Sequence, residues 1–215
     1  MSTVRTSSGR RLLLDDVDWT TYTRLLWAFA ERPSIRLTYD RGRLEIMSPL
    51  PMHECNVELL GRFVVVLTEE LGLPLRSGGS TTYRRRKQKR GLEPDNSYWI
   101  ANEPKVRGKE RFDWRTDPPP DLAHEVDATR SSMNRMAIYA VLGVPEVWRG
   151  EQGTLSFHIL GTDGRYREGT HSLAFPGLKP ADLQAFLALV GTMDENALVR
   201  KFRDWVRQRI AAGWK

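Results

Sequence analysis

Apolar residues recur along the chain with two different periods, and each period predicts a different element. Between residues 17 and 30, and again from 53 to 71, they return every three or four positions, which is the spacing of an amphipathic helix. In the longer stretch, Val57 and Leu60 begin a stripe that is expected to face the core. Gly72 is expected to end this helix.

Short alternating or apolar runs bounded by turn residues predict strands. Residues 36–39 and 44–47 alternate around Asp40-Arg41-Gly42, which is a hairpin signal. Further strands are expected at 75–76, 81–85, 97–100, 146–148, 155–160 and near Tyr166, and further helices from Ser131 or Ser132 to 142, at 181–190 and at 195–210. The polar stretch 102–120 predicts a long surface loop. Strands interleaved with helices favour a mixed α/β layer fold.

One predicted strand, residues 121–127, carries acidic side chains among apolar ones. Side chains alternate along a strand, so Glu125 and Asp127 are expected on one face, with Leu122, His124 and Val126 on the other. Inward carboxylates are costly to desolvate unless something cationic compensates their charge. A hard divalent cation such as Mg²⁺ is a common solution, and it can activate water and stabilise charge on a phosphate. The strand therefore indicates metal-assisted hydrolysis, with nucleic acid as the expected substrate.

A second acidic cluster, Glu93-Pro94-Asp95, precedes another predicted strand. Pro94 favours a strand start or an edge position, so Asp95 is expected at a strand end. A carboxylate there, beside Glu125 on a neighbouring strand, is suited to holding one ion. The alternative is that these acids cap turns or pair with arginines.

Arg135 and Tyr139 are four residues apart on the next predicted helix, so they project from one face. If that helix packs beside the Glu125 strand, Arg135 can reach the site and counter negative charge there. It would act as an electrostatic stabiliser, because arginine does not deprotonate. The alternative is an ion pair between Arg135 and Asp127 that ties helix to strand.

His53 and Glu54 stand at the start of the helix predicted for 53–71. This position is at the edge of the core, where either side chain can orient water or contact substrate, and Glu54 suits the positive end of a helix. Plain capping is the alternative role for each.

The net charge of +6 is concentrated in one stretch. Arg84, Arg85, Arg86, Lys87, Lys89 and Arg90 supply six positive charges with no acid among them, so the rest of the chain is formally neutral. Such a compact basic element favours contact with nucleic-acid phosphates. A solvated hairpin or an edge strand protected by charge is the alternative.

The rest of the sequence excludes several classes of protein. The 215 residues are expected to form one domain with terminal additions, and no stretch approaches the apolar length of a membrane span. The polar, basic N-terminus and the lone Cys55 favour a reducing, cytoplasmic setting. The chain contains no zinc spacing, serine-hydrolase elbow or nucleotide-binding glycine motif.

Taken in order, these residues resemble the Uma-type family of restriction-endonuclease-like proteins, within the PD-(D/E)xK nuclease superfamily. The matching segments are RGRLEIMSP at 41–49, the next helix with His53 and Glu54, EPD at 93–95, PPPDLAHEVD at 118–127 and NRMAIYAVLGVPEVW at 134–148. Together they cover most of residues 35–160 in the family's order and approximate spacing.

The resemblance implies a restriction-endonuclease-like core at about 35–160, with a central mixed β-sheet flanked by helices and a C-terminal helical extension at about 180–213. It also implies a site for Mg²⁺ or Mn²⁺ held by Asp95 and Glu125, and a DNA phosphodiesterase that is often a homodimer. The chain departs from the superfamily where a lysine is expected two residues after Glu125, because Asp127 stands there. Arg135 is the candidate substitute, although arginine and lysine differ in acidity and geometry.

Two other functions stay open at this point. The missing lysine and the concentrated charge are compatible with a nucleic-acid-binding or regulatory protein that has lost catalysis. The third possibility is an oligomeric scaffold in which Trp205 and the C-terminal helix form the interface.

Overall fold

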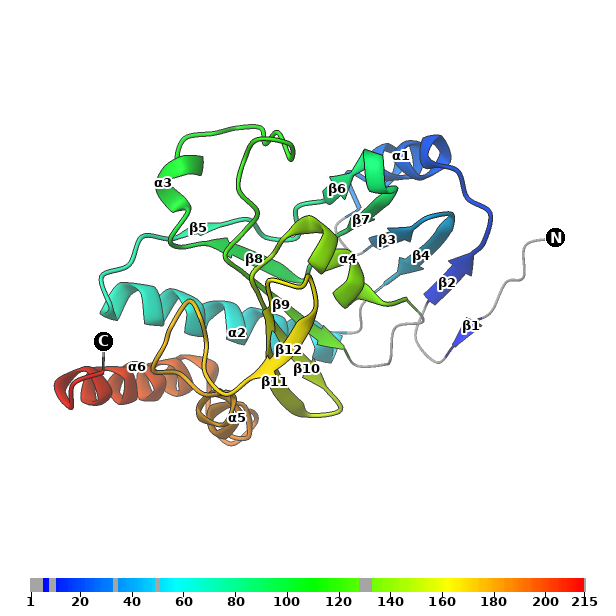
Figure 1. The fold of residues 1–215 in the computed structure, drawn as a ribbon. Coiled ribbons are helices and arrows are strands. Elements are labelled where there is room, and N and C mark those ends of the chain that lie inside the picture. The colour runs from blue at the N-terminus through cyan, green and yellow to red at the C-terminus, as the bar shows by residue number, and fades with distance from the viewer. Residues whose placement is uncertain (1–5, 8–10, 33–34, 49–50, 128–132, 215) are drawn as a thin grey trace.

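The fold consists of two β-sheets with helices between and around them, as Figure 1 shows. The structure is a computed structural model and describes residues 6–7, 11–32, 35–48, 51–127 and 133–214, with the backbone alone for 6–7, 51–54 and 127. Over these residues both sheets have six strands.

Each sheet has its own strand order. Sheet A, in spatial order, contains β1 (Thr6–Ser7), β2 (Arg11–Leu14), β4 (Arg43–Met47), β3 (Arg36–Asp40), β7 (Arg90–Leu92) and β6 (Tyr83–Arg85). Sheet B contains β12 (Tyr166–Gly169), β11 (Thr154–Leu160), β10 (Glu146–Glu151), β9 (Leu122–Asp127), β8 (Asn96–Trp99) and β5 (Arg76–Ser77). The pairings within sheet A are antiparallel. In sheet B β9 and β10 are parallel, so this sheet is the mixed one.

The helices cover the sheets on different sides. They are α1 (Trp19–Ala28), α2 (Pro51–Glu70), α3 (Glu103–Val106), α4 (Arg135–Leu142), α5 (Pro180–Leu187) and α6 (Glu195–Ala211). The parallel pair β9–β10 needs a crossover, and α4 supplies it. In Figure 1, α2, α5 and α6 lie on one side of sheet B, and α4 lies on the other side, towards sheet A.

Three groups of buried apolar residues fill the spaces between these layers. One lies between sheet B and α2, α5 and α6, and includes Phe63, Trp148 and Phe202. A second joins α4 to both sheets through residues such as Tyr83 and Ile138. The third lies under α1, against β3 and β4. Helix α4 is therefore enclosed between the sheets, and polar side chains on it are buried.

The mixed α/β class and the central mixed sheet predicted from the sequence are confirmed. The predicted helix at 131–142 begins later, at Arg135, where the Asn134 side chain accepts the Ala137 N–H, while Ser131 and Ser132 lie outside the described residues. Gly143 ends it with φ of 80°, as expected from a glycine at this position. The stretch 102–120 is not wholly irregular, because it contains α3.

No helix in the described part of the chain is both long and apolar enough to cross a membrane.

Candidate active site

Glu93-Pro94-Asp95 is the shortest link between the described strands of the two sheets. Strand β7 ends at Leu92 in sheet A, and β8 begins at Asn96 in sheet B, so these three residues make the whole crossing. Both acids in the link are buried or half-buried. The Glu93 side chain accepts hydrogen bonds from sheet A and from the segment before β6, and the Asp95 side chain accepts one from sheet B.

The Glu93 carboxylate makes its hydrogen bonds on the sheet A side of the link. Its two carboxylate oxygens accept the Leu37 N–H at 3.0 Å and the Thr82 hydroxyl at 2.7 Å. Burial raises the pKa of the Glu93 carboxyl, and the hydrogen bond from Thr82 offsets part of that rise. Glu93 therefore holds the link to β3 and to the segment before β6.

Asp95 is bonded on the sheet B side, next to Glu125. Its Oδ2 accepts the backbone N–H of Val126 at 2.7 Å, and its side chain is 8% exposed. In the antiparallel register Asn96 pairs with His124, so continuing the ladder by one residue sets Asp95 opposite Glu125. The register thus sets the backbone positions of Asp95 and Glu125 side by side on neighbouring strands, and their sharing of one ion stays a prediction.

Glu125 points towards α4. It is 4% exposed, and its Oε1 accepts hydrogen bonds from the Arg135 guanidinium at 2.5 Å and from the Tyr139 hydroxyl. The prediction that Arg135 and Tyr139 share one helix face and reach the Glu125 strand agrees with these contacts. Among the described side chains Glu125 is the carboxylate partner of Arg135, while the side chain of Asp127, the alternative partner, lies outside the described part.

The Arg135 guanidinium also binds two groups outside β9. One nitrogen donates to the Thr38 hydroxyl of β3 and another donates to the backbone carbonyl of Glu93 at 2.8 Å. Burial disfavours the charge on Arg135, but the neighbouring Glu125 carboxylate outweighs that penalty and raises the pKa of Arg135. Arg135 therefore stays a cation at the point where α4 and both sheets meet.

The pKa of Tyr139 is also raised. Burial is the largest cause, and the charge of Glu125 adds to it. Tyr139 therefore serves as a hydroxyl donor to Glu125 rather than as a phenolate.

The alternation predicted for β9 is observed. Leu122 and Val126 pack on the α2 side of sheet B, and His124 on the same face lies beside the Tyr98 ring, 5.7 Å away. Ala123 and Glu125 face α4. The side chain of Asp127, the last residue of β9, lies outside the described part, so its predicted role is an open expectation.

His53 and Glu54 fall in the first turn of α2, as predicted, but their side chains too lie outside the described part. Among the side chains that the structure describes, no group of three His, Cys, Asp or Glu residues could hold a metal ion. The described portion of the site is thus the pair Asp95 and Glu125 with its bonded neighbours.

Two buried polar residues of sheet A were not predicted for this region. Thr38 and Glu45 are directly opposite each other on β3 and β4 and are both 2% exposed. Residues paired in this way project from the same face, so Glu45 lies on the face that Thr38 presents to Arg135. The alternation of polar and apolar residues in Arg43–Met47 predicts that Glu45 faces away from the apolar side of the strand. It does not predict that α4 covers the face on which Glu45 lies.

The basic stretch forms β6, a short 3₁₀ turn at Arg86–Gln88 and β7, with β6 at the edge of sheet A. Arg86, Lys87 and Lys89 are exposed, and Arg90 pairs with Asp40 at 2.9 Å. This is the charged edge strand that the sequence offered as an alternative, and such an edge resists pairing with other strands. Contact with phosphates is compatible with the same geometry and stays a prediction.

The chain matches the Uma2 family, described as "Putative restriction endonuclease", over residues 19–194. This match covers most of the chain, and the protein belongs to that family. No curated protein matches the chain.

Proposed function

We propose that the protein is a metal-dependent endonuclease that hydrolyses DNA phosphodiester bonds. The observation that carries the proposal is the 2.7 Å hydrogen bond from the Val126 N–H to Asp95, which holds Asp95 against the strand that carries Glu125. Membership of this family supports a nuclease function for the protein. The proposed active site is therefore formed by the residue before β8, by β9 and by α4.

The residues at the junction fit Mg²⁺ or Mn²⁺ by their chemistry. Asp95 and Glu125 are buried carboxylates, and carboxylate oxygens are the ligands that such hard cations prefer. A carboxylate has about four lone-pair positions, so a hydrogen bond at one oxygen is compatible with a metal contact. When bound, the cation would activate a water molecule and stabilise charge on the phosphate. Asp127 is proposed as a further oxygen ligand.

Arg135 is proposed to supply the fixed positive charge. Its contacts to Thr38, Glu93 and Glu125 hold the guanidinium in one orientation, so it needs little rearrangement to counter developing negative charge. Because the pKa of Arg135 is raised, it does not remove a proton from water. Tyr139 acts with it by holding the Glu125 carboxylate.

Several further features belong to the same proposal. The basic hairpin at 84–90 would engage the DNA backbone, and His53 or Glu54 would orient water or substrate at the start of α2. The protein would act as a homodimer in the cytoplasm, where the exposed thiol of Cys55 stays reduced.

The test is nicking of supercoiled plasmid with Mg²⁺ or Mn²⁺, with EDTA as the metal-free control. Asp95→Asn is the primary variant, because the asparagine carbonyl can still accept the Val126 N–H while the negative charge is lost. Glu125→Gln is the second variant, and Asp204→Asn on the exposed side of α6 is the matched control. We expect nicking by the wild type and by Asp204→Asn, and none by the site variants.

Calorimetric titration with Mg²⁺ and thermal melting accompany the assay, so that loss of metal binding is separated from loss of folding. Cleavage that survives Asp95→Asn and Glu125→Gln together would reject this site. Salt-sensitive DNA binding without cleavage or metal binding would instead identify a nuclease fold that has become a binding module.

A further inference from the structure

A groove runs between α1, the basic hairpin and the loop that precedes β9. It consists of two hollows of about 520 and 810 Å³, which share Trp27, Arg84 and Trp114 among their lining residues. We call the two together the tryptophan groove. The predicted site used only the charged residues of the hairpin, so the aromatic residues here have no assigned role.

The aromatic lining is unusually accessible. Trp27, on α1, is 76% exposed, which is the largest value among the exposed large apolar side chains of the described residues. Trp114 borders both hollows, and its ring is stacked on Phe112 at 5.1 Å. Phe112 is in turn stacked on the buried Trp99 at 4.8 Å, so Trp114 ends a row of rings anchored in the core.

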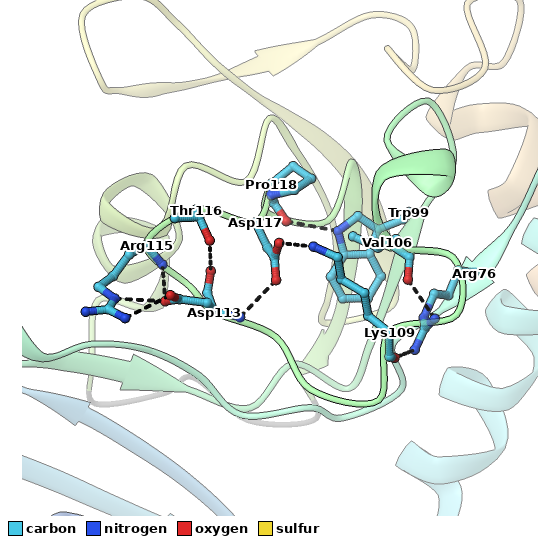
Figure 2. A network of polar contacts seen from close by, with 9 residues as sticks. All are labelled: Arg76, Trp99, Val106, Lys109, Asp113, Arg115, Thr116, Asp117 and Pro118. Carbon is cyan, nitrogen blue, oxygen red and sulfur yellow. Dashed lines mark hydrogen bonds and ion pairs between the residues drawn. The ribbon is translucent and has the colours of Figure 1, made fainter.

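The loop that carries Phe112 and Trp114 is held by a network of polar contacts, which Figure 2 shows. Arg76 donates to two carbonyls of the loop, including Val106 at 2.8 Å. Asp117 accepts the Asp113 N–H at 2.8 Å and pairs with Lys109. The Trp114 ring is therefore presented by a braced loop, which lowers the entropy that binding would cost.

The charges along the groove are mainly positive. The larger hollow is lined by four consecutive cations, Arg84, Arg85, Arg86 and Lys87. Its one acid, Asp113, pairs with Arg115, which also lines it, and this arginine lowers the pKa of Asp113 to about 2. The occupant that these side chains favour is therefore an anion.

The smaller hollow touches the link between the sheets through Glu93, although Asp95, Glu125 and Arg135 do not line it. Glu93 lines it, and the backbone carbonyl of Glu93 binds Arg135, which in turn holds Glu125. The tryptophan groove thus ends at the link that carries Asp95.

We infer that the tryptophan groove binds an unpaired segment of a nucleic-acid strand. Its phosphates would lie along Arg84 to Lys87, and its bases would stack on Trp27 and Trp114. Aromatic rings bind bases through their faces, which are available in a single strand and hidden in a stacked duplex. A surface that served duplex phosphates alone would need the cations without the exposed rings. The inference rests on the proposed function only in taking nucleic acid as the substrate.

Fluorescence anisotropy in EDTA tests this inference, because binding is measured there without cleavage. The probes are a labelled oligothymidylate and a duplex of the same length. We expect the wild type to bind the single strand more tightly, and Trp27→Ala to weaken that binding by about tenfold, since stacking is worth roughly 1–3 kcal/mol per base. Trp27→Phe should retain part of the affinity. Leu173→Ala, at another exposed apolar position, should have no effect.

The cations are tested by the dependence of affinity on salt. Arg86→Ala with Lys87→Ala should lower the salt slope, whereas Arg200→Ala with Lys201→Ala on the exposed side of α6 should leave it unchanged. Trp114→Ala is a secondary variant, because loss of its packing against Tyr83 can disturb folding. Trp27 is largely exposed, so its replacement is not expected to disturb folding.

Three results would overturn the inference. The first is equal or tighter binding of the duplex with no effect of Trp27→Ala. The second is displacement of the single strand by polyglutamate at equal charge, which would indicate an acidic peptide as the occupant. The third is conversion of a dimer to a monomer by Trp27→Ala with strand affinity unchanged, which would make the groove an interface. Strand binding is measured in EDTA and so needs no metal, which makes failure of the nuclease proposal distinguishable from failure of this one.

Discussion

The guanidinium of Arg135 binds the carboxylate of Glu125 and the backbone carbonyl of Glu93 at the same time. It therefore joins α4, β9 and the link between the sheets at a single buried point. The importance of this contact is both electrostatic and structural, since removal of either partner leaves a charge without compensation in the interior.

Arg135→Met is expected to destabilise the protein by about 3–5 kcal/mol, because it leaves the buried Glu125 without its cation. Methionine is close to arginine in length, so the change is mainly one of charge and hydrogen bonding. Urea unfolding followed by circular dichroism measures the difference. Arg115→Met, at the exposed pair with Asp113, is the matched control and should leave the free energy of unfolding close to that of the wild type. Equal costs for the two variants would contradict the buried role of Arg135.

Tyr139→Phe is expected to cost about 1.5–3 kcal/mol, because it removes a hydrogen bond to a charged carboxylate and keeps the ring. The control is Tyr39→Phe, whose hydroxyl donates to the neutral carbonyl of Val17 at 2.9 Å. This variant should cost about 0.5–1.5 kcal/mol. A larger loss for Tyr39→Phe in the same unfolding assay would argue against a charged acceptor at Tyr139.

The pH dependence of stability should reveal Glu93. Its pKa in the folded protein is raised above the ordinary value of 4.5, so the folded state binds this proton more tightly than the unfolded state does. The wild type therefore loses stability from this group as the pH rises above 4.5 and Glu93 ionises. Because glutamine carries no charge, the stability of Glu93→Gln relative to the wild type should increase as the pH rises above 4.5. A difference in unfolding free energy that is constant over this range would show that the carboxyl is not desolvated.

Local periodicity was enough to predict most of the fold. The helices near 17–30, 53–71 and 195–210 and the strand at 121–127 are found close to their expected bounds. Strand β7 was missed because it lies inside the basic run and contains Gly91, so it has no apolar alternation of its own. Strand β2 was missed because its three consecutive leucines show no polar–apolar alternation.

The site could be predicted only in part, for a related reason. Asp95 and Glu125 were predicted to lie on neighbouring strands, and Arg135 was expected to reach Glu125 only if its helix packed beside that strand. The contacts of Arg135 to Thr38 and Glu93 depend on how sheet A packs on α4, and periodicity carries no information about that. The aromatic lining beside the basic hairpin was missed for the same reason.

A truncation tests whether residues 1–215 form one domain, as we propose. Helix α6 lies beyond the family match, yet it contributes Leu198, Val199, Phe202 and Val206 to the core beside α2. At roughly 2 kcal/mol for each buried side chain, about 8 kcal/mol of burial would be lost by ending the chain at residue 194. We expect this fragment to aggregate or to unfold without cooperativity.

The control for the truncation is Arg207→Ala, which breaks only an exposed bond to Glu70 and should melt within a few degrees of the wild type. A fragment 1–194 with the melting temperature of the whole chain would show instead that α6 is an appendage.

The three-residue link also limits how the molecule can move. The chain also passes between the sheets through α2 and through residues 78–82, but Glu93, Pro94 and Asp95 form the shortest passage, and the proline ring fixes one of its few torsions. A movement of sheet A relative to sheet B would therefore also displace the backbone that carries the Asp95 carboxylate.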